Sequence, residues 1–130
     1  MKTLIVFYSK TGFTKKVALF LAKSLKADVD EIKDIKSRKG LIRYLISGKE
    51  AIKKIIPRIK SPKKNPAKYG VVVFGTPLWG NVYSPMSAYL SQKKNFKSIA
   101  FFCTQKGGRA DNALKEMQNL AGKPTAVLVL

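Results

Sequence analysis

The side chains best suited to binding a ligand lie in one short turn, which reads Ser9-Lys10-Thr11-Gly12-Phe13-Thr14. The turn follows an apolar run and leads into an amphipathic one, so we expect a strand to enter a helix here. Such a turn points backbone N–H groups and hydroxyls at one spot, with the positive end of the helix dipole behind them. Gly12 permits a positive φ or close approach of the backbone. The pattern therefore suits a phosphate group, to which Lys10 adds positive charge.

A simpler interpretation of this turn is an ordinary capped helix, in which Thr11 or Thr14 accepts bonds from free N–H groups and no ligand binds. The spacing matches neither the P-loop nor the glycine-rich dinucleotide motif. A phosphate bound here would be held by hydroxyls and amides. The turn alone leaves both interpretations open.

Composition excludes several kinds of catalytic site. The chain has no histidine and a single cysteine. Histidine-dependent triads, histidine zinc sites, histidine haem ligation, thiolate clusters and intrachain disulfides are therefore ruled out. The seven carboxylates are mostly scattered, which gives little support to a two-carboxylate mechanism. We assign no catalytic residue and no metal ligand, and expect a bound cofactor to supply any chemistry.

The charge of the chain is strongly positive, with 26 Lys and Arg against 7 Asp and Glu, a net charge of +19. Such a field favours acidic partners, nucleic acid or anionic lipid. Residues 33–68 hold 13 of the basic residues and 2 acidic ones. The simplest explanation of this segment is a solvated face; binding of an anionic membrane or nucleic acid through residues 36–68 is an alternative. No apolar run is long enough to span a membrane, and no signal peptide precedes the first strand, so we expect a cytoplasmic protein.

Apolar periodicity predicts the elements that position the turn. Strands and helices alternate, and the third strand is a continuous apolar run typical of a buried parallel strand. The order predicts an α/β fold, a doubly wound parallel sheet forming one domain over residues 1–130. Between the second helix and the third strand, residues 57–69 are expected to form an extended, solvated connection. We expect strands at residues 2–8, 28–32, 71–74, 98–103 and 125–130, and helices at residues 13–26, 41–56, 85–92 and 110–121.

Ligands of such sheets bind beyond the carboxyl ends of the central strands. Three loops leave those ends, at residues 8–14, 75–84 and 104–109. The second loop, Gly75-Thr76-Pro77-Leu78-Trp79-Gly80-Asn81-Val82-Tyr83-Ser84, carries the only tryptophan of the chain. Together the first and second loops resemble the flavodoxin family, whose FMN-phosphate loop has the pattern [ST]-x-T-G-x-T and whose second loop is similar to T-P-x-W-G.

The resemblance implies a five-stranded sheet of order 2-1-3-4-5 and FMN as the cofactor. It implies that the first loop, Ser9 to Thr14, holds the FMN phosphate. Residues of the second loop would lie against the flavin ring, with the peptide between Gly80 and Asn81 near its N5 atom. The third loop would lie near the pyrimidine end of the ring. The implied ring contacts are Thr76, Pro77, Leu78, Trp79, Gly80 and Asn81, then Thr104, Gln105, Lys106, Gly107 and Gly108.

The chain departs from the family pattern in four respects. It is basic where flavodoxins are typically acidic, its third loop lacks the usual Gly-Asp and second aromatic residue, and its segment 36–68 is longer and more cationic. The sequence also stops at the fifth strand, without the family's final helix. We therefore expect an acidic redox partner, and uncovered strand surface that supports a homodimer or packing against another protein. Cys103 is expected to be a small apolar core residue.

The resemblance implies a redox carrier that transfers electrons through bound FMN. Such a carrier needs no catalytic acid or base, which agrees with the composition. One alternative is a flavodoxin-like FMN oxidoreductase acting on a quinone or a tetrapyrrole. Another is a non-redox basic module that binds nucleic acid or an anionic membrane. Whether the protein is a carrier or an enzyme stays open on the sequence.

Overall fold

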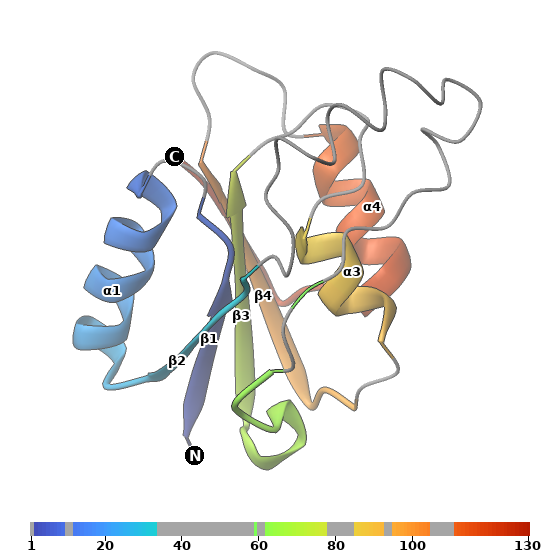
Figure 1. The fold of residues 1–130 in the computed structure, drawn as a ribbon. Coiled ribbons are helices and arrows are strands. Elements are labelled where there is room, and N and C mark those ends of the chain that lie inside the picture. Colours follow the sequence, from blue (N-terminus) through green and yellow to red (C-terminus); the bar gives the residue numbers. More distant parts are fainter. Residues whose placement is uncertain are drawn as a thin grey trace.

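The computed structural model describes residues 2–9, 12–33, 59, 62–77, 85–92, 95–104 and 111–130. Its strands form one five-stranded, all-parallel sheet of order β2-β1-β3-β4-β5. Helix α1 covers one face of this sheet, and α3 and α4 cover the other (Figure 1). The strands are β1 Thr3–Phe7, β2 Asp28–Glu31, β3 Val71–Pro77, β4 Ser98–Thr104 and β5 Ala126–Val129, and the helices are α1 Phe13–Leu25, α3 Pro85–Ser91 and α4 Asp111–Ala121.

This architecture confirms the predicted fold class and strand order. The predicted strands and three of the predicted helices appear within a few residues of their expected bounds. The helix predicted at residues 41–56 lies outside the described residues. In the described part of the chain, no helix combines the length and apolarity that crossing a membrane requires.

The side chains of the central strands form one hydrophobic core on each face of the sheet. On β1, Leu4 and Val6 face α3 and α4, whereas Ile5 and Phe7 face α1, and all four are at most 1% exposed. Strand β3 alternates in the same way beside it. Strands buried on both faces need apolar residues at every position, which accounts for the unbroken runs in the sequence.

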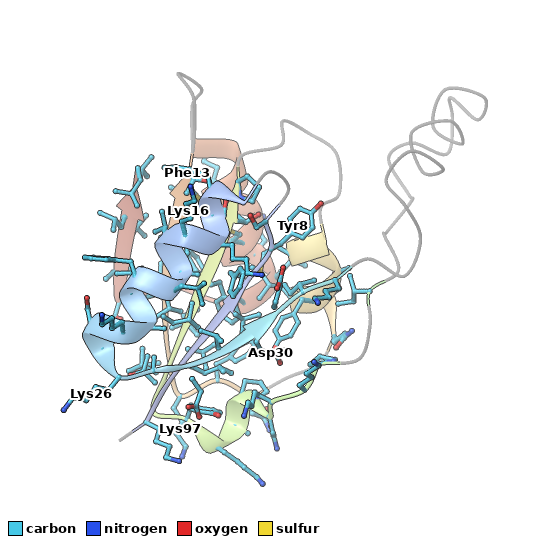
Figure 2. The ribbon with its side chains drawn as sticks, turned by 60° about the vertical axis from the view of Figure 1, so that its left-hand side comes forward. Tyr8, Phe13, Lys16, Lys26, Asp30 and Lys97 are labelled. Carbon is cyan, nitrogen blue, oxygen red and sulfur yellow. The ribbon has the colours of Figure 1, made fainter. Side chains whose placement is uncertain are left out.

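Strand β2 lies at the edge of the sheet, as predicted, and its carboxylates hold a neighbouring segment there. The Tyr69 hydroxyl donates a hydrogen bond to Asp28 Oδ2 at 2.7 Å. The backbone N–H of Lys64 donates to Asp30 Oδ2 at 2.9 Å. Asp30, labelled in Figure 2, is only 5% exposed, so this bond compensates for the loss of its contact with water.

The predicted extended, solvated connection at residues 57–69 is wrong in its last part. Pro66–Lys68 form a short 3₁₀ helix, and Asn65 caps it by accepting a hydrogen bond from the N–H of Ala67 at 3.1 Å. Pro66 and Tyr69 are buried. Asn followed by Pro is a typical helix start, and the β2 carboxylates provide partners that are distant in sequence.

Gly75 permits the close contact between β3 and β4 on the α1 face. It is paired in register with Phe102, whose ring lies across it and is 1% exposed. A Cβ atom added at Gly75 would lie 1.9 Å from Cζ of Phe102. No side chain larger than hydrogen is therefore compatible with this position of the ring.

We expect Gly75→Ala to lower the free energy of unfolding by about 3 kcal/mol, because the ring of Phe102 must be displaced from its core. Urea unfolding followed by circular dichroism would measure this. Adding Phe102→Leu to Gly75→Ala should recover part of the loss. Gly12→Ala serves as the control, since nothing lies within 4 Å of its added Cβ. Its positive φ should cost only about 1 kcal/mol. Equal losses for the two alanine variants would contradict the steric argument.

Candidate functional site

The candidate site lies at the end of the sheet where the carboxyl ends of the neighbouring strands β1, β3 and β4 are found (Figure 1). Phe7 is in register with Gly75, and Pro77 with Thr104. The N–H of Tyr8 donates to the carbonyl of Gly75 at 3.0 Å, which extends the pairing of β1 with β3 by one residue. The three loops singled out in the sequence therefore leave adjacent strands.

The turn between β1 and α1 is organised by Ser9 and Gly12. The N–H of Gly12 donates to Oγ of Ser9 at 3.0 Å. Gly12 is the N-cap of α1, with φ 97° and ψ −12° in the left-handed region that favours glycine. Its carbonyl accepts the first helical bond, from the N–H of Lys16 at 3.0 Å. A glycine N-cap has no side-chain oxygen, so it leaves the N–H groups of the first turn available.

Thr14 does not cap the helix. Its hydroxyl lies 2.8 Å from the hydroxyl of Thr104 at the end of β4, and both residues are at most 4% exposed. The capping interpretation is therefore wrong for Thr14, and Thr11 lies outside the described residues. A hydroxyl has one hydrogen to donate and two lone pairs. When Thr104 donates to Thr14, the hydrogen of Thr14 can serve a second acceptor.

The electrostatics of this helix end favour an anion. The first turn of α1 contains no acidic residue. Lys15 is paired with Glu31 of β2 at 3.5 Å. Lys16 lies at the same end of α1 as Phe13 (Figure 2) and is exposed. The positive end of the helix dipole and this cation act on the same region.

The space beside Gly12 tests whether the turn can accept a phosphate. A Cβ built at this position meets no atom within 4 Å apart from those of its two neighbours in the chain, so the backbone is open to an approaching group. The hydroxyl of half-buried Ser9 accepts from Gly12 and keeps its hydrogen for another acceptor. N–H groups that no side chain caps, a hydroxyl donor and a positive potential are the donor set that phosphate prefers. The described residues of the turn therefore fit an FMN phosphate.

The second and third loops are described only where they leave their strands. Thr76 is 4% exposed, and its hydroxyl donates to the carbonyl of Pro77 at 3.1 Å. Pro77, the last residue of β3, is half-buried, and Phe13 is 54% exposed. The other predicted site residues lie outside the described part of the chain: Lys10, Thr11, Leu78, Trp79, Gly80, Asn81, Gln105, Lys106, Gly107 and Gly108.

The pairing of Thr14 with Thr104 was not predicted from the sequence. Thr104 was expected to begin the third loop, but it is the last residue of β4. Alternation along β4 contained a usable signal, because Ala100, Phe102 and Thr104 occupy every second position and face α1.

Cys103 faces away from α1 and belongs to the core beneath α3 and α4. It is completely buried, and burial raises the pKa of its thiol to about 11. The thiol is therefore protonated at neutral pH, and thiolate chemistry is suppressed. This confirms the prediction of a small apolar core residue.

Comparison with known proteins identifies structural neighbours only. No protein-family model matches the chain, and no curated protein matches it in sequence. A flavoprotein from Lactobacillus acidophilus, solved in complex with FMN, is similar with a TM-score of 0.78 and 24% identity, over 98% of this chain and 92% of that one. The apo form of the flavoprotein from Lactobacillus acidophilus, solved by NMR, has a TM-score of 0.72 at 24% identity, over 98% of this chain and 91% of that one. A candidate flavoprotein from Bacteroides uniformis has a TM-score of 0.78 at 23% identity, over 99% and 89% of the two chains. At this identity the likeness shows that the fold is flavodoxin-like.

The buried hydroxyl pair should show strong coupling in a double-mutant cycle. Thr104→Val or Thr14→Val alone leaves one buried hydroxyl without its partner and should cost about 1 to 3 kcal/mol. The double variant removes both polar groups, so its loss should be smaller than the sum of the single losses. Urea unfolding of the four proteins measures the coupling energy. Strictly additive losses would show that the two hydroxyls do not interact.

The Cys103 thiol should make stability depend on alkaline pH. Its folded-state pKa lies above its ordinary value of 9.0, so its stabilising contribution is complete below pH 9 and is lost as pH rises towards 11. The stability difference between the natural chain and Cys103→Ala should be constant below pH 9 and shrink by about 2 kcal/mol above it. Using a difference cancels the titration of lysines, which both proteins share. A difference independent of pH would contradict the assignment.

Proposed function

We propose that this chain binds FMN, with the phosphate at the turn between β1 and α1, and transfers electrons through the bound flavin. The observation that carries the proposal is the open start of α1 beside the Ser9 hydroxyl. No side chain caps it, and no atom beyond the two neighbouring residues lies within 4 Å of a Cβ built on Gly12. The similarity in fold to a flavoprotein solved with FMN supports the same ligand.

In this proposal each part of the turn has a separate role. The Ser9 hydroxyl, already fixed by the Gly12 N–H, donates its remaining hydrogen to a phosphate oxygen. The N–H groups of the first turn of α1 point at the same group. Lys16 and the helix dipole stabilise its negative charge. The pair of Thr14 and Thr104 holds the start of α1 against β4, which keeps these donors in place.

The remaining predicted contacts concern the ring. We propose that Pro77, Leu78 and Trp79 cover one side of it and that residues 104–108 border its pyrimidine end. FMN supplies the electron-transfer chemistry when bound, and the polypeptide supplies binding, orientation and exclusion of water.

A carrier role is the simplest form of the proposal, because the chain has no histidine and few carboxylates to act as acids or bases. We further propose that the redox partner is acidic, since the chain has a net charge of +19. The rate of association with such a partner should fall steeply with ionic strength. Steady-state turnover with quinones or NAD(P)H would instead indicate an oxidoreductase.

The test is a titration of the purified chain with FMN, followed by the fluorescence of its single tryptophan and by calorimetry. We expect one FMN per chain, with strong quenching of Trp79. Ser9→Ala should weaken FMN binding about 10- to 100-fold, as expected for a hydrogen bond to a charged group. Riboflavin, which lacks the phosphate, should bind Ser9→Ala and the natural chain equally. Ser24→Ala, in the exposed last turn of α1, is the matched control.

Two outcomes would contradict the proposal. Failure to bind FMN would leave the basic surface as the main functional feature, and salt-dependent binding of DNA would then favour the non-redox module. Equal loss of FMN and riboflavin binding in Ser9→Ala would mean that the turn does not hold the phosphate.

A further inference from the structure

A row of lysines lies at the amino ends of the strands, at the end of the sheet opposite the candidate site. One lysine precedes each of the five strands, and all five are exposed. Figure 2 shows two of them, Lys26 and Lys97, at the opposite end of the sheet from Tyr8 and Lys16. In the order of the strands across the sheet, the five residues that we call the lysine row are Lys26 before β2, Lys2 before β1, Lys68 before β3, Lys97 before β4 and Lys123 before β5.

The registers of the sheet bring these lysines level with one another. Strands β1 and β2 are paired from Leu4 and Asp28, so Lys2 and Lys26, each two residues earlier, are level at this end. The N–H of Gly70 donates to the carbonyl of Lys2 at 2.9 Å, so the residues that lead into β3 lie next to β1.

The other half of the row is aligned in the same way. Strands β4 and β5 are paired from Ala100 and Ala126, so Lys97 and Lys123, each three residues earlier, are level with each other. Both lysines line one cavity of about 160 Å³. Neighbouring strands lie about 4.8 Å apart, so the row extends over about 19 Å.

The positive charge of the row outweighs the opposing charges beside it. Helices α1, α3 and α4 each lead into the next strand, so their negative dipole ends lie at this end of the sheet and contribute about half a charge each. Of the carboxylates whose side chains the structure describes, Asp28 begins β2 and accepts a hydrogen bond from Tyr69. Subtracting Asp28 and the three helix ends from the five lysines leaves a net charge of about +2.5. The sequence has no Asp or Glu in the stretches that lead into the strands, which are residues 1–2, 26–27, 65–70, 92–97 and 122–125.

A line of cations suits a linear polyanion. Double-stranded DNA carries one negative charge per 1.7 Å or so, which places about 11 charges within the length of the row. Lysine binds phosphate as a point charge and needs no particular geometry. Each lysine of the row can therefore contact a phosphate whatever the base sequence is.

Other anionic surfaces fit the row less well. A basic patch holds a protein stably on a membrane only together with a lipid chain or an apolar face. Leu25 on α1 and Leu120 on α4 are the exposed leucines nearest the row, but they lie on opposite faces of the sheet. An acidic protein would need carboxylates in a line of matching length. Base stacking by a single strand needs exposed aromatic rings, whereas beside the row Tyr69 is buried and Phe96 is half-buried.

We propose that the lysine row binds the phosphate backbone of a double-stranded nucleic acid, independently of base sequence. This inference does not depend on FMN binding. Strand β3 has seven residues and runs between the two sites, which separates them by about 23 Å. Both sites can therefore be occupied at the same time.

The test uses a fluorescently labelled DNA duplex of about 20 base pairs, with NaCl varied from about 20 to 200 mM. Fluorescence anisotropy measures its binding to the full chain, with and without FMN. The slope of log K against log salt counts the phosphates that the protein neutralises, at about −0.9 for each. We expect saturable binding that is unchanged by FMN and equal for AT-rich and GC-rich duplexes.

Two variants that lose the same charge locate the contact. The row variant should reduce the magnitude of the salt slope by about 3.6 and weaken binding at least about tenfold. The control variant should keep its slope within about one unit of that of the natural chain. The row variant replaces four lysines of internal connections, Lys26→Gln, Lys68→Gln, Lys97→Gln and Lys123→Gln. The control variant replaces four lysines of the basic segment 36–68, Lys36→Gln, Lys39→Gln, Lys53→Gln and Lys54→Gln.

Single substitutions keep the test valid should the row variant fail to fold, as judged by circular dichroism. Lys68→Gln and Lys97→Gln should each reduce the magnitude of the slope by about 0.9. Lys115→Gln, at an exposed position on α4, is the matched control and should leave the slope unchanged.

Four results would overturn the proposal. Loss of slope in the control variant but not in the row variant would place the contact on the segment 36–68. Tighter binding of single-stranded DNA than of the duplex would indicate base stacking. Displacement of the duplex by polyglutamate at equal charge concentration would identify an acidic polypeptide as the occupant. The fourth is absence of duplex binding, and phosphatidylserine vesicles that bind the natural chain but not the row variant would then identify a membrane.

Discussion

The structure depends on the burial of β1 and β3 on both faces. A strand buried on both sides needs a covering layer on each, so α1 must lie on one face and α3 and α4 on the other. Because the strands are parallel, their carboxyl ends all lie at the same end of the sheet. The connection from β1 to α1 begins at that end of the sheet because it joins a strand buried on both faces to the helix that covers it. The same packing of helices on the two faces of the sheet thus forms the core and places the candidate site.

Much of the fold was predictable because its signals are local. Unbroken apolar runs identified β1 and β3, and Gly122 marked the end of α4, where it has φ 105°. The hydrogen bonds of Asp28 and Asp30 to the segment at residues 64–69 were not predictable, since they join residues more than 30 positions apart. The 3₁₀ helix at Pro66 depends on that tertiary contact as well as on its own sequence.

The candidate site was predicted in part. Ser9 and Gly12 were identified from residue types, and the structure shows how one fixes the other. The contact of Thr14 with Thr104 spans 90 positions and needs knowledge of how α1 lies over β4. The alternation of side chains along β4 predicts that Thr104 faces α1. Only the packed structure shows that its partner there is Thr14. Local chemistry therefore predicts the donors, and tertiary packing determines their arrangement.

The burial of Cys103 has a practical consequence for experiments on this protein. It is the only cysteine of the chain, it is completely buried, and its thiol is protonated at neutral pH. Alkylating reagents react with the accessible thiolate, so the natural chain should give almost no background labelling. A cysteine introduced at an exposed position, such as Ser24, would then be the single reactive thiol. Spin labels and fluorophores can thus be attached at chosen positions without first removing the native residue.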